Sequence, residues 1–386
     1  MRVRTGLEVL LRDPGEYLEG SIGLITNPTG VTPDLTSTID TFHAHPGIEV
    51  MVIFGPEHGA RGDVQDALPV ESHTDGATGL PVHSLYGEFE KPTPEMLEGV
   101  ETLVLDIQDV GARFYTYVST LTYALGAASE GGIGFVVLDR PNPLNGVDVE
   151  GGVLKPGFES FIGLHPVPIR HGLTIGELAL MINGEIGADL RVVGMEGWER
   201  SMWFDETQLP WVMPSPNLPT LKTATVYPGT CLFEGVNISE GRGTTRPFEL
   251  IGAPWINGRD WAGEVNDIGL PGVRFRACHF NPTFAKHAGK LCNGVQIHVT
   301  DRRTLKPVET GLHMLASALR LWSEELRWTP PSHSEHPHFD LLVGTDKVRE
   351  ALIRGESAEE IVGSWRDDLD VFEGVRRESL IYGGEE

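Results

Sequence analysis

The sequence predicts an α/β protein built on a parallel β-sheet, followed by a smaller α+β region. Four apolar runs rich in β-branched residues each end abruptly in a polar turn that contains Gly or Pro, at residues 23–30, 52–59, 103–111 and 136–143. Apolar runs without polar alternation are typical of strands buried on both faces, as in parallel sheets. Helical segments separate the runs, which is the order expected of right-handed crossovers between parallel strands.

The helices of this first part follow from breakers, caps and periodicity. We expect a helix over residues 34–45, a helical turn over 94–99 and a longer helix over 114–129. A further helix is expected over 174–187, because Thr174 and Glu177 have the spacing of a capping box.

After residue 195 the pattern changes. Residues 196–222 are rich in Trp, Pro and Met and indicate an extended connection. Strand-like runs at 225–227, 273–276 and 295–300 and helices at 309–327 and 358–372 then predict an α+β second part. We therefore divide the chain into domains of residues 1–220 and 221–386. His333, His336 and His338 lie in a loop with Pro and Ser, which indicates an exposed linker rather than a metal site.

Composition excludes several classes of partner. The net charge of −25 predicts no binding to nucleic acid or to an anionic membrane, because both would be repelled. An anionic substrate would need a local cluster of Arg or Lys. The three cysteines are far apart without a Cys-x-x-Cys pair, so a reducing compartment is expected. No signal-peptide core and no membrane-length apolar run occur, which predicts a cytoplasmic protein, or a secreted or periplasmic one if a leader was removed.

Cofactor motifs are missing, so no cofactor is expected. The glycine-rich segment 131–134 ends a predicted helix and precedes a strand, whereas a dinucleotide fingerprint must follow a strand and open a helix. No phosphate-binding P-loop and no Gly-x-Ser-x-Gly nucleophile motif occur either.

Polar side chains follow each of the four predicted strands. Because ligands of open α/β sheets bind outside the carboxyl ends of the strands, these residues should converge on one rim: Asn27, Glu57, Asp106, Asp109 and Asn142.

Residues 55–62 hold the strongest candidate catalytic groups of this rim. Glu57 and His58 stand side by side among glycines that allow close approach of a substrate. Partly removed from water, Glu57 could serve as a general acid. The alternative is a structural ion pair between Glu57 and Arg61.

The turns after the third and fourth strands add hydrogen-bonding groups. Asp109 could cap the following helix rather than take part in catalysis, and the Tyr115 ring could simply pack in the protein core. Two Asn side chains, Asn142 and Asn145, stand rigidly in a double-Pro turn and suit sugar hydroxyl and acetamido groups.

A second cluster lies at residues 234–249. Arg242 and Arg246, with Thr244 and Thr245 between them, form a loop suited to a carboxylate or phosphate. Surface ion pairs with Glu234, Glu240 and Glu249 are the alternative.

Six ordered segments (55–59, 106–117, 139–146, 170–174, 213–217 and 239–246) resemble the family once catalogued as DUF1343. This family includes exo-β-N-acetylmuramidases of the NamZ type, in glycoside hydrolase family 171. The resemblance covers nearly the whole chain. It implies a Rossmann-like larger domain, a smaller second domain and a cleft between them. The implied activity is release of N-acetylmuramic acid from the non-reducing end of peptidoglycan fragments, with Glu57 as the catalytic carboxylate.

The residues and the resemblance together give the predicted site. The predicted catalytic residues are Glu57, Asp106, Asp109 and Tyr115; the predicted substrate-binding residues are Asn27, His58, Arg61, Gln108, Arg113, Tyr117, Asn142, Asn145, His171, Asn217, Asn237, Glu240, Arg242 and Arg246. The two arginines of the second cluster are assigned to the lactyl carboxylate of muramic acid.

The second catalytic group stays open. Asp106, Asp109 or Glu240 could partner Glu57, or the acetamido group of the substrate could act as nucleophile, polarised by Asp109, Asn142 or Tyr115. Two other functions also stay open: a non-catalytic binding protein for muropeptides or sugars, and a phosphosugar-processing enzyme.

Overall fold

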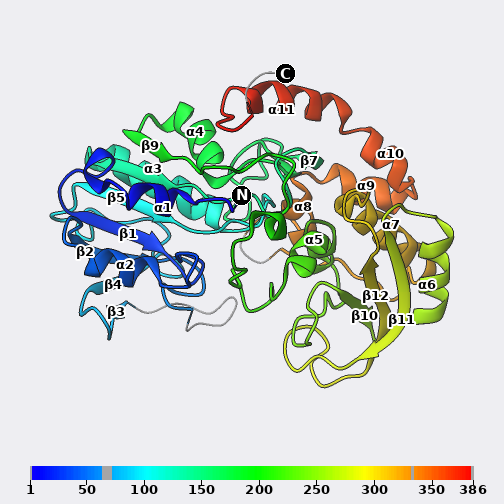
Figure 1. Cartoon of the computed structure of the whole chain (residues 1–386). Coiled ribbons are helices and arrows are strands. Elements are labelled where there is room, and N and C mark those ends of the chain that lie inside the picture. The colour runs from blue at the N-terminus through cyan, green and yellow to red at the C-terminus, as the bar shows by residue number, and fades with distance from the viewer. Residues whose placement is uncertain (1, 63–71, 332–333, 384–386) are drawn as a thin grey trace.

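A seven-stranded sheet forms the core of the first part of the chain (Figure 1). In this computed structural model, which describes residues 2–62, 72–331 and 334–383, the strand order is β3-β4-β2-β1-β5-β6-β9. All neighbouring strands are parallel except β3 against β4. The strands are β1 (Ile22–Thr26), β2 (Val50–Gly55), β3 (His73–Thr74), β4 (Pro81–Ser84), β5 (Thr102–Asp106), β6 (Gly134–Leu138) and β9 (Leu190–Val193).

The four predicted strands are confirmed as β1, β2, β5 and β6. Their register aligns their carboxyl ends, since Ile25 pairs with both Phe54 and Leu105, and Leu105 pairs with Val137. The turns that follow these strands therefore emerge at one edge of the sheet, as the fold class requires.

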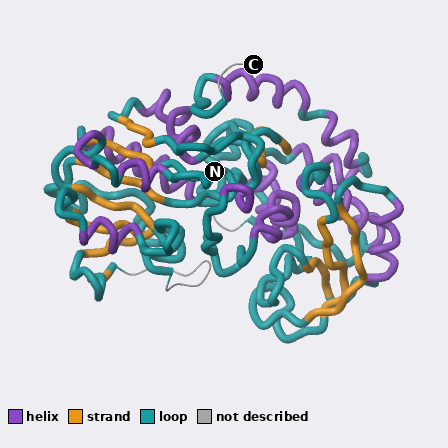
Figure 2. Tube along the Cα trace, viewed as in Figure 1, coloured by secondary structure: helices purple, strands orange, loops and turns teal. Residues whose placement is uncertain are grey.

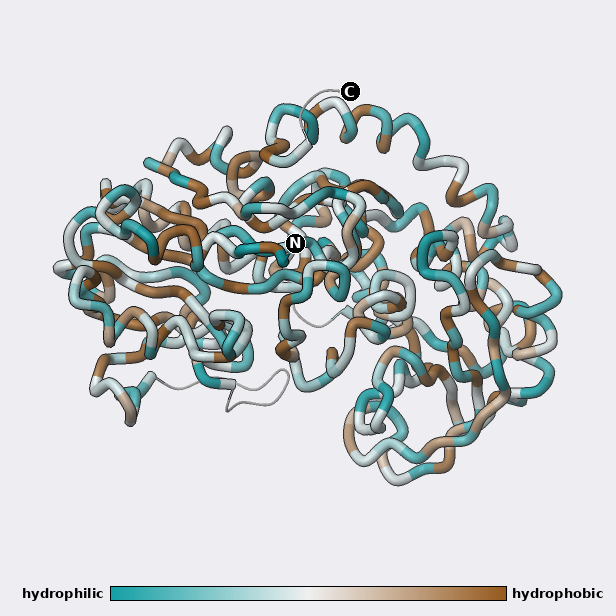
Figure 3. The backbone as a smooth tube through the Cα atoms, viewed as in Figure 1, coloured by the Kyte–Doolittle hydropathy of each residue, from teal (hydrophilic) through white to brown (hydrophobic). Residues whose placement is uncertain are grey.

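Alternating side chains of the central strands build the core on both faces of the sheet. Leu103 and Leu105 pack with α3 (Tyr117–Gly131) and α4 (Ile175–Ile186) on one face. Val104 packs on the other face with α1 (Gly6–Leu10) and α2 (Thr38–Ala44). The central strands are accordingly apolar along most of their length (Figure 3).

Local capping decides where the helices begin. The capping box of α4 is confirmed: the Thr174 amide donates to Glu177 Oε2 at 3.0 Å, and the Glu177 amide donates to Thr174 Oγ1 at 3.2 Å. The helix expected over 34–45 begins only at Thr38, because Ser37 accepts the amide of Asp40 at 3.0 Å and so caps it there.

The second part of the chain holds a three-stranded antiparallel sheet with helices beside it (Figure 2). A two-stranded sheet, β7 (Glu150–Val153) and β8 (Pro168–Arg170), lies between β6 and α4 in the sequence. The remaining strands are β10 (Leu250–Ala253), β11 (Val273–Phe280) and β12 (Cys292–Val299), and the helices are α5 (Leu221–Thr230), α6 (Gly258–Asp267), α7 (Pro307–Leu321), α8 (His338–Val343), α9 (Lys347–Arg354), α10 (Ala358–Gly363) and α11 (Arg366–Arg377).

Three expectations for this part are corrected. The strand predicted at 225–227 is wrong, because those residues lie in α5, which Thr220 caps by accepting the amide of Thr223 at 3.2 Å. The helix predicted over 309–327 ends at Leu321, and the helix predicted over 358–372 is two helices, α10 and α11. Short apolar runs do not distinguish strand from helix, and packing decided here.

The end of the chain returns to the large sheet. The Tyr382 hydroxyl donates to Asp139 Oδ2 at 2.5 Å and accepts the amide of Met195 at 2.8 Å. Figure 1 shows α11 running from the second part back over the first. Among the described residues, no helix combines the length and apolar character needed to cross a membrane.

Helices α5 and α7 touch through glycines. A Cβ added at Gly311 would overlap the carbonyl oxygen of Gly229, and a Cβ added at Gly229 would overlap that of Pro307. The two backbones can approach this closely only where side chains are absent.

We expect Gly311→Ala to lower the free energy of unfolding by about 1–3 kcal/mol, because the new methyl group must push the helices apart. Gly263→Ala is the matched control: Gly263 lies inside α6 with open space around it, so Ala should raise stability by up to about 1 kcal/mol. Urea unfolding of both variants measures the difference. Equal stability of the two variants would contradict this account of the helix contact.

Glu150 links β7 to the start of α7. Its Oε1 accepts the amide of Glu309 at 2.9 Å, one of the amides that a helix leaves unpaired at its first turn. Burial raises the pKa of Glu150 to about 7, although the charge of Arg170 opposes the rise. The folded protein thus keeps a proton here that the unfolded chain loses.

This shift predicts a stability that falls as pH rises. The contribution of Glu150 is fully present below its ordinary pKa and is lost as pH rises through about 7, by about 3 kcal/mol in total. Glu150→Gln should lack this contribution to the pH dependence of the free energy of unfolding, which urea unfolding measures between pH 5 and pH 8. Glu98→Gln, at an exposed side chain, should keep the wild-type slope; an unchanged slope in Glu150→Gln would contradict the assignment.

Candidate active site

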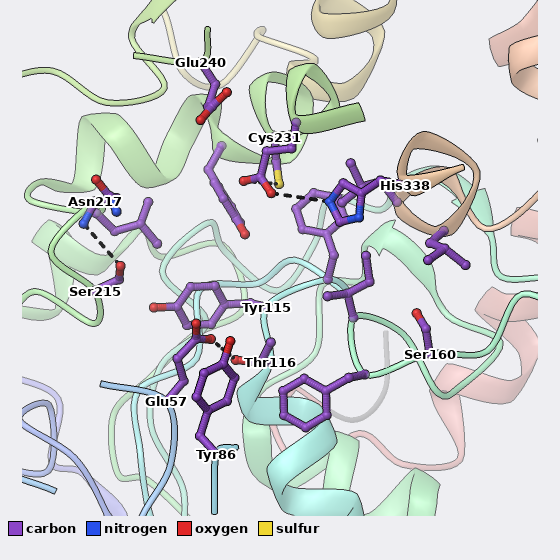
Figure 4. A pocket seen from close by; sticks show the side chains of 18 of the residues that line it. Glu57, Tyr86, Tyr115, Thr116, Ser160, Ser215, Asn217, Cys231, Glu240 and His338 are labelled. Carbon is purple, nitrogen blue, oxygen red and sulfur yellow. Dashed lines mark hydrogen bonds and ion pairs between the residues drawn. The ribbon is translucent and has the colours of Figure 1, made fainter. Parts of the chain in front are cut away.

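A cavity of about 990 Å³ lies at the carboxyl edge of the large sheet and is lined from both parts of the chain. Glu57, His58 and Thr116 come from the first part, and Tyr227, Glu240 and Arg242 come from the second. In Figure 4, Glu240 and Cys231 lie across the cavity from Glu57 and Tyr86. The volume is at the upper end of the range for small-molecule sites, which leaves room for more than one sugar ring.

Glu57 stands on a tight turn directly after β2. The Gly59 amide donates to the Pro56 carbonyl at 2.9 Å, and His58 and Gly59 both have left-handed φ values, +76° and +79°. A left-handed backbone at a residue such as His58 is strained, and strain of this kind clusters at functional sites. A Cβ at Gly55 would lie 2.7 Å from the Ala60 amide, so the turn also needs glycine there.

The side chain of Glu57 is half-buried and oriented by the first turn of α3. The Thr116 hydroxyl donates to Glu57 Oε2 at 2.8 Å. Thr116 occupies the N-cap of α3 but makes no capping bond, so its hydroxyl serves the carboxyl group instead. This bond holds one oxygen of Glu57 and fixes the direction of the other.

Tyr115 lies above Glu57 in the view of Figure 4. Its ring packs edge-on against Tyr117 at 4.8 Å and Tyr227 at 6.0 Å between centroids. Burial, and then the neighbouring Tyr117, Tyr227 and Glu57, raise the pKa of Tyr115 well above its ordinary value. The phenol therefore stays protonated and can donate a hydrogen bond.

The opposite wall is a network of paired charges. Arg242 Nη1 donates to Glu234 Oε1 at 2.5 Å and lies 3.4 Å from Glu240 Oε1, while its guanidinium stacks 4.8 Å from the centre of the Phe248 ring. Lys286 Nζ donates to Glu240 Oε2 at 3.0 Å. The two cations therefore lie within one corner of an otherwise acidic molecule.

Glu234 is the most strongly held group of this wall. Burial opposes its ionisation, but the charge of Arg242 and the contact with His338 outweigh burial and keep the pKa of Glu234 below its usual range. His338 Nε2 lies 3.5 Å from Glu234 Oε2. Burial, followed by the charge of Glu234, raises the pKa of Cys231 well above that of a free thiol, so this cysteine is not activated.

Six of the predicted site residues line the cavity: Glu57, His58, Tyr115, Asn217, Glu240 and Arg242. The Asn217 amide donates to Ser215 Oγ at 3.2 Å, and its side-chain Nδ2 has no hydrogen-bond partner among the described residues. Of the three carboxylates predicted as partners of Glu57, the structure brings only Glu240 to the cavity wall.

The other two candidate carboxylates lie below the cavity lining. Asp106 is fully buried and accepts Arg140 Nε at 2.5 Å and Nη2 at 2.9 Å. Asp109 accepts the amide of Gly111 at 2.7 Å and lies 3.6 Å from His171 Nε2. Asp109 does not cap α3, which begins eight residues later at Tyr117.

The remaining predicted residues hold loops together around the cavity instead of lining it. Arg113, for example, is buried and donates to the carbonyls of Gly152, Val167 and Leu342 at 2.7 Å each. The others make these bonds: Asn27 with Thr29, Gln108 with Pro141, Tyr117 with Pro214, Asn142 with Leu173, Asn145 with Asp148, and Asn237 with Arg327.

Two predicted arginines are also paired away from the cavity lining. Arg61 pairs with Asp40 and Asp75, both at 2.8 Å, and not with Glu57 as the alternative interpretation proposed. Arg246 pairs with Glu249 at 2.9 Å, and its side chain is 52% exposed. Arg242 is thus the arginine of the predicted pair that faces the site.

The ion pairs predicted as the alternative for the cluster at residues 234–249 are present, Arg242 with Glu234 and Glu240 and Arg246 with Glu249. Several other cavity residues were not predicted from the sequence: Tyr86, Tyr123, Phe161, Tyr227, Lys286 and His338. Most of them lie outside the predicted motifs, so only the residues around them in the folded structure identify them as part of the site. The expected linker around the three histidines is wrong for His338, which begins α8 and faces Glu234. His333 lies outside the described residues. No group of three or more metal-ligating side chains occurs in the part of the chain that the structure describes.

Family models match almost the whole chain: the exo-β-N-acetylmuramidase NamZ N-terminal domain over residues 22–222 and its C-terminal domain over residues 225–382. The chain belongs to this family. It is 50% identical over 384 residues to the peptidoglycan β-N-acetylmuramidase NamZ of Bacillus subtilis, covering 99% of this chain and 92% of that protein.

Two solved structures of DUF1343 family proteins from Bacteroides fragilis share the fold. One has a TM-score of 0.91 at 38% identity and covers 99% of both chains, and the other has a TM-score of 0.79 at 32% identity and covers both chains fully. The resemblance described for the sequence is therefore confirmed, together with its Rossmann-like sheet and smaller second part.

Proposed function

We propose that this protein is an exo-acting glycosidase that releases N-acetylmuramic acid from the non-reducing end of peptidoglycan fragments. One observation carries the proposal beyond family membership: the same cavity holds an oriented carboxyl group, Glu57, and a corner in which Glu234 and Glu240 hold two cations, Arg242 and Lys286. The first suits cleavage of a glycosidic bond, and the second suits the carboxylate that distinguishes muramic acid from N-acetylglucosamine.

In the proposed reaction Glu57 acts as general acid. Its protonated carboxyl group gives a proton to the glycosidic oxygen as the bond to the anomeric carbon breaks, so the leaving sugar departs as a neutral alcohol. Thr116 holds Oε2 of the same carboxyl group and so directs the other oxygen. Water supplies the hydroxyl group that ends on the anomeric carbon, and the proton that this water loses restores the Glu57 carboxyl group.

A chromogenic β-glycoside of N-acetylmuramic acid tests the function directly. Release of the chromophore supports the glycosidase. Binding without cleavage would instead support a non-catalytic sugar-binding protein, and preference for a phosphorylated sugar would support a phosphosugar-processing enzyme.

We expect Glu57→Gln to lower kcat about 10²–10⁴-fold while the protein still binds substrate, because the amide cannot donate the proton in the same way. Glu185→Gln, at an exposed position of α4, is the matched control and should keep wild-type kcat. Steady-state kinetics with the chromogenic glycoside and a binding titration measure both effects. A Glu57→Gln variant with near wild-type kcat would remove Glu57 from the mechanism.

We expect Arg242→Ala to narrow the preference for muramic acid over N-acetylglucosamine glycosides, mainly by weakening cleavage of the former. A buried site that pairs a charged group rejects ligands lacking that group by several orders of magnitude, so the loss should be about 100-fold or more in the selectivity ratio. Arg246→Ala should keep the wild-type ratio, since its side chain pairs with Glu249 away from the cavity lining. If Arg242→Ala keeps the ratio, the lactyl carboxylate is recognised elsewhere.

A further inference from the structure

A group of three aromatic side chains forms one flank of the cavity. Tyr86, Tyr123 and Phe161 all line it, and all three are half-buried. The Tyr123 and Phe161 rings are nearly parallel, 19° apart with centroids at 6.2 Å, and Tyr86 lies 5.9 Å from Phe161. None of the three belongs to the hydrophobic core clusters of the fold. Packing in the protein core therefore does not account for these three rings, which face the cavity.

One face of α3 ties this aromatic group to Glu57. Thr116 donates to Glu57, Ser119 Oγ donates to the Phe161 carbonyl at 2.6 Å, and Tyr123 is itself part of the group. Residues 116, 119 and 123 are three and four apart, so they lie on one side of the helix. Seven residues of helix span about 10 Å, so Tyr123 lies about two turns of α3 beyond Thr116, the residue that holds Glu57.

The loop that carries Phe161 is fixed before any ligand binds. Ser160 and Gly163 exchange two backbone hydrogen bonds, at 2.9 and 2.8 Å, which close a tight turn around Phe161. Ser160 Oγ is buried, has no hydrogen-bond partner among the described residues and belongs to the cavity lining. The flank therefore offers flat apolar rings together with an unused hydroxyl group. That combination suits a sugar, whose ring has an apolar C–H face and a polar edge.

Charge divides the two ends of the cavity. Arg242 and Lys286 both contact Glu240, which lies across the cavity from Glu57 in Figure 4. Glu159 directly precedes Ser160 of the aromatic flank, and Glu90 lies near enough to Tyr123 for its charge to add to burial in raising the pKa of that phenol. The wall across from Glu57 offers a carboxylate two hydrogen-bond-donating cations, Arg242 and Lys286, whose charges Glu234 and Glu240 balance. At the aromatic flank Glu90 and Glu159 repel a carboxylate, so a carboxylate-bearing sugar is favoured at the Arg242 end. Glu57 lies on the same side of the cavity as the aromatic group. Because the acid gives its proton to the oxygen of the leaving sugar, the leaving sugar must lie on that side.

We propose that Tyr86, Tyr123, Phe161 and Ser160 form the subsite for the leaving group, and that this subsite takes an uncharged pyranose ring. The proposal rests on the proposed function for its orientation, with the muramic acid ring at the Arg242 end. It adds which residues hold the other side of the scissile bond. Phe161 provides the central ring, Tyr86 and Tyr123 flank it, and Ser160 hydrogen-bonds a hydroxyl group of the bound ring.

Two ligands separate the subsite from the rest of the site: the disaccharide of N-acetylmuramic acid β-1,4-linked to N-acetylglucosamine, and methyl β-N-acetylmuramic acid glycoside, which lacks the second ring. In the Glu57→Gln background, we expect Phe161→Ala to raise the Kd of the disaccharide about tenfold, because the apolar C–H face of the second ring loses the flat apolar surface on which it is buried. The Kd of the methyl glycoside should change by less than about twofold. Calorimetric titration measures both values, without requiring turnover.

Two further variants control for folding and for the aromatic ring itself. Tyr17→Ala removes a half-buried aromatic ring that does not line the cavity; it should leave both Kd values unchanged. Phe161→Tyr keeps the flat ring and should restore disaccharide binding.

The outcomes are distinct. Equal weakening of both ligands by Phe161→Ala, or no weakening of either, would overturn the subsite. Wild-type protein that binds both ligands but cleaves neither would overturn the proposed function, while a selective loss of disaccharide binding would still support the subsite.

Discussion

The buried ion pair between Asp106 and Arg140 is the constraint on which the rim of the sheet depends. It joins the end of β5 to the second residue after β6, and both side chains are almost completely removed from water. Asp106 also accepts the hydroxyl group of Thr38 at the start of α2, and Arg140 donates to the carbonyl of Val31 at 3.0 Å. A buried charge of this kind is costly unless every partner is in place, so the pair fixes three loops at once. The turn carrying Glu57 is built on the edge that these loops complete.

Around that edge, polar side chains act mainly on the backbone. Arg113 binds carbonyls from β7, from the segment before β8 and from α8, so a single buried guanidinium connects the large sheet to the second part of the chain. Tyr382 does the same from the end of the chain through Asp139. The cavity between the two parts is therefore preorganised, because the groups that define its walls are held by buried hydrogen bonds.

The charge distribution explains how an acidic protein can accept an anion. The net charge of −25 would repel a carboxylate from most of the surface. Arg242 and Lys286 are gathered in one partly buried corner, where Glu234 and Glu240 hold them in place. Those carboxylates orient the cations and also lower their net attraction. Binding there therefore depends on geometry within the cavity more than on long-range steering.

Sequence alone determined the sheet and the first catalytic candidate. The four buried runs identified β1, β2, β5 and β6, because strands covered on both faces must be continuously apolar. The parallel arrangement then placed Glu57 at the carboxyl edge, and the Thr174 capping box fixed the start of α4. These features depend on local pattern and on a topological rule, both of which can be read along the chain.

Only the tertiary structure decided which polar residues face the cavity. Asp106, Asp109, Asn142 and Arg113 follow strands just as Glu57 does, yet their side chains turn into the protein and bind backbone or buried partners. Arg242 and Arg246 look equivalent in sequence, and contacts with Phe248, Glu234 and Glu240 direct Arg242 to the site. No sequence pattern indicated the aromatic flank, because Tyr86, Tyr123 and Phe161 come from three separate segments of the chain. Strand ends specify where polar residues gather; long-range contacts specify which way each side chain points.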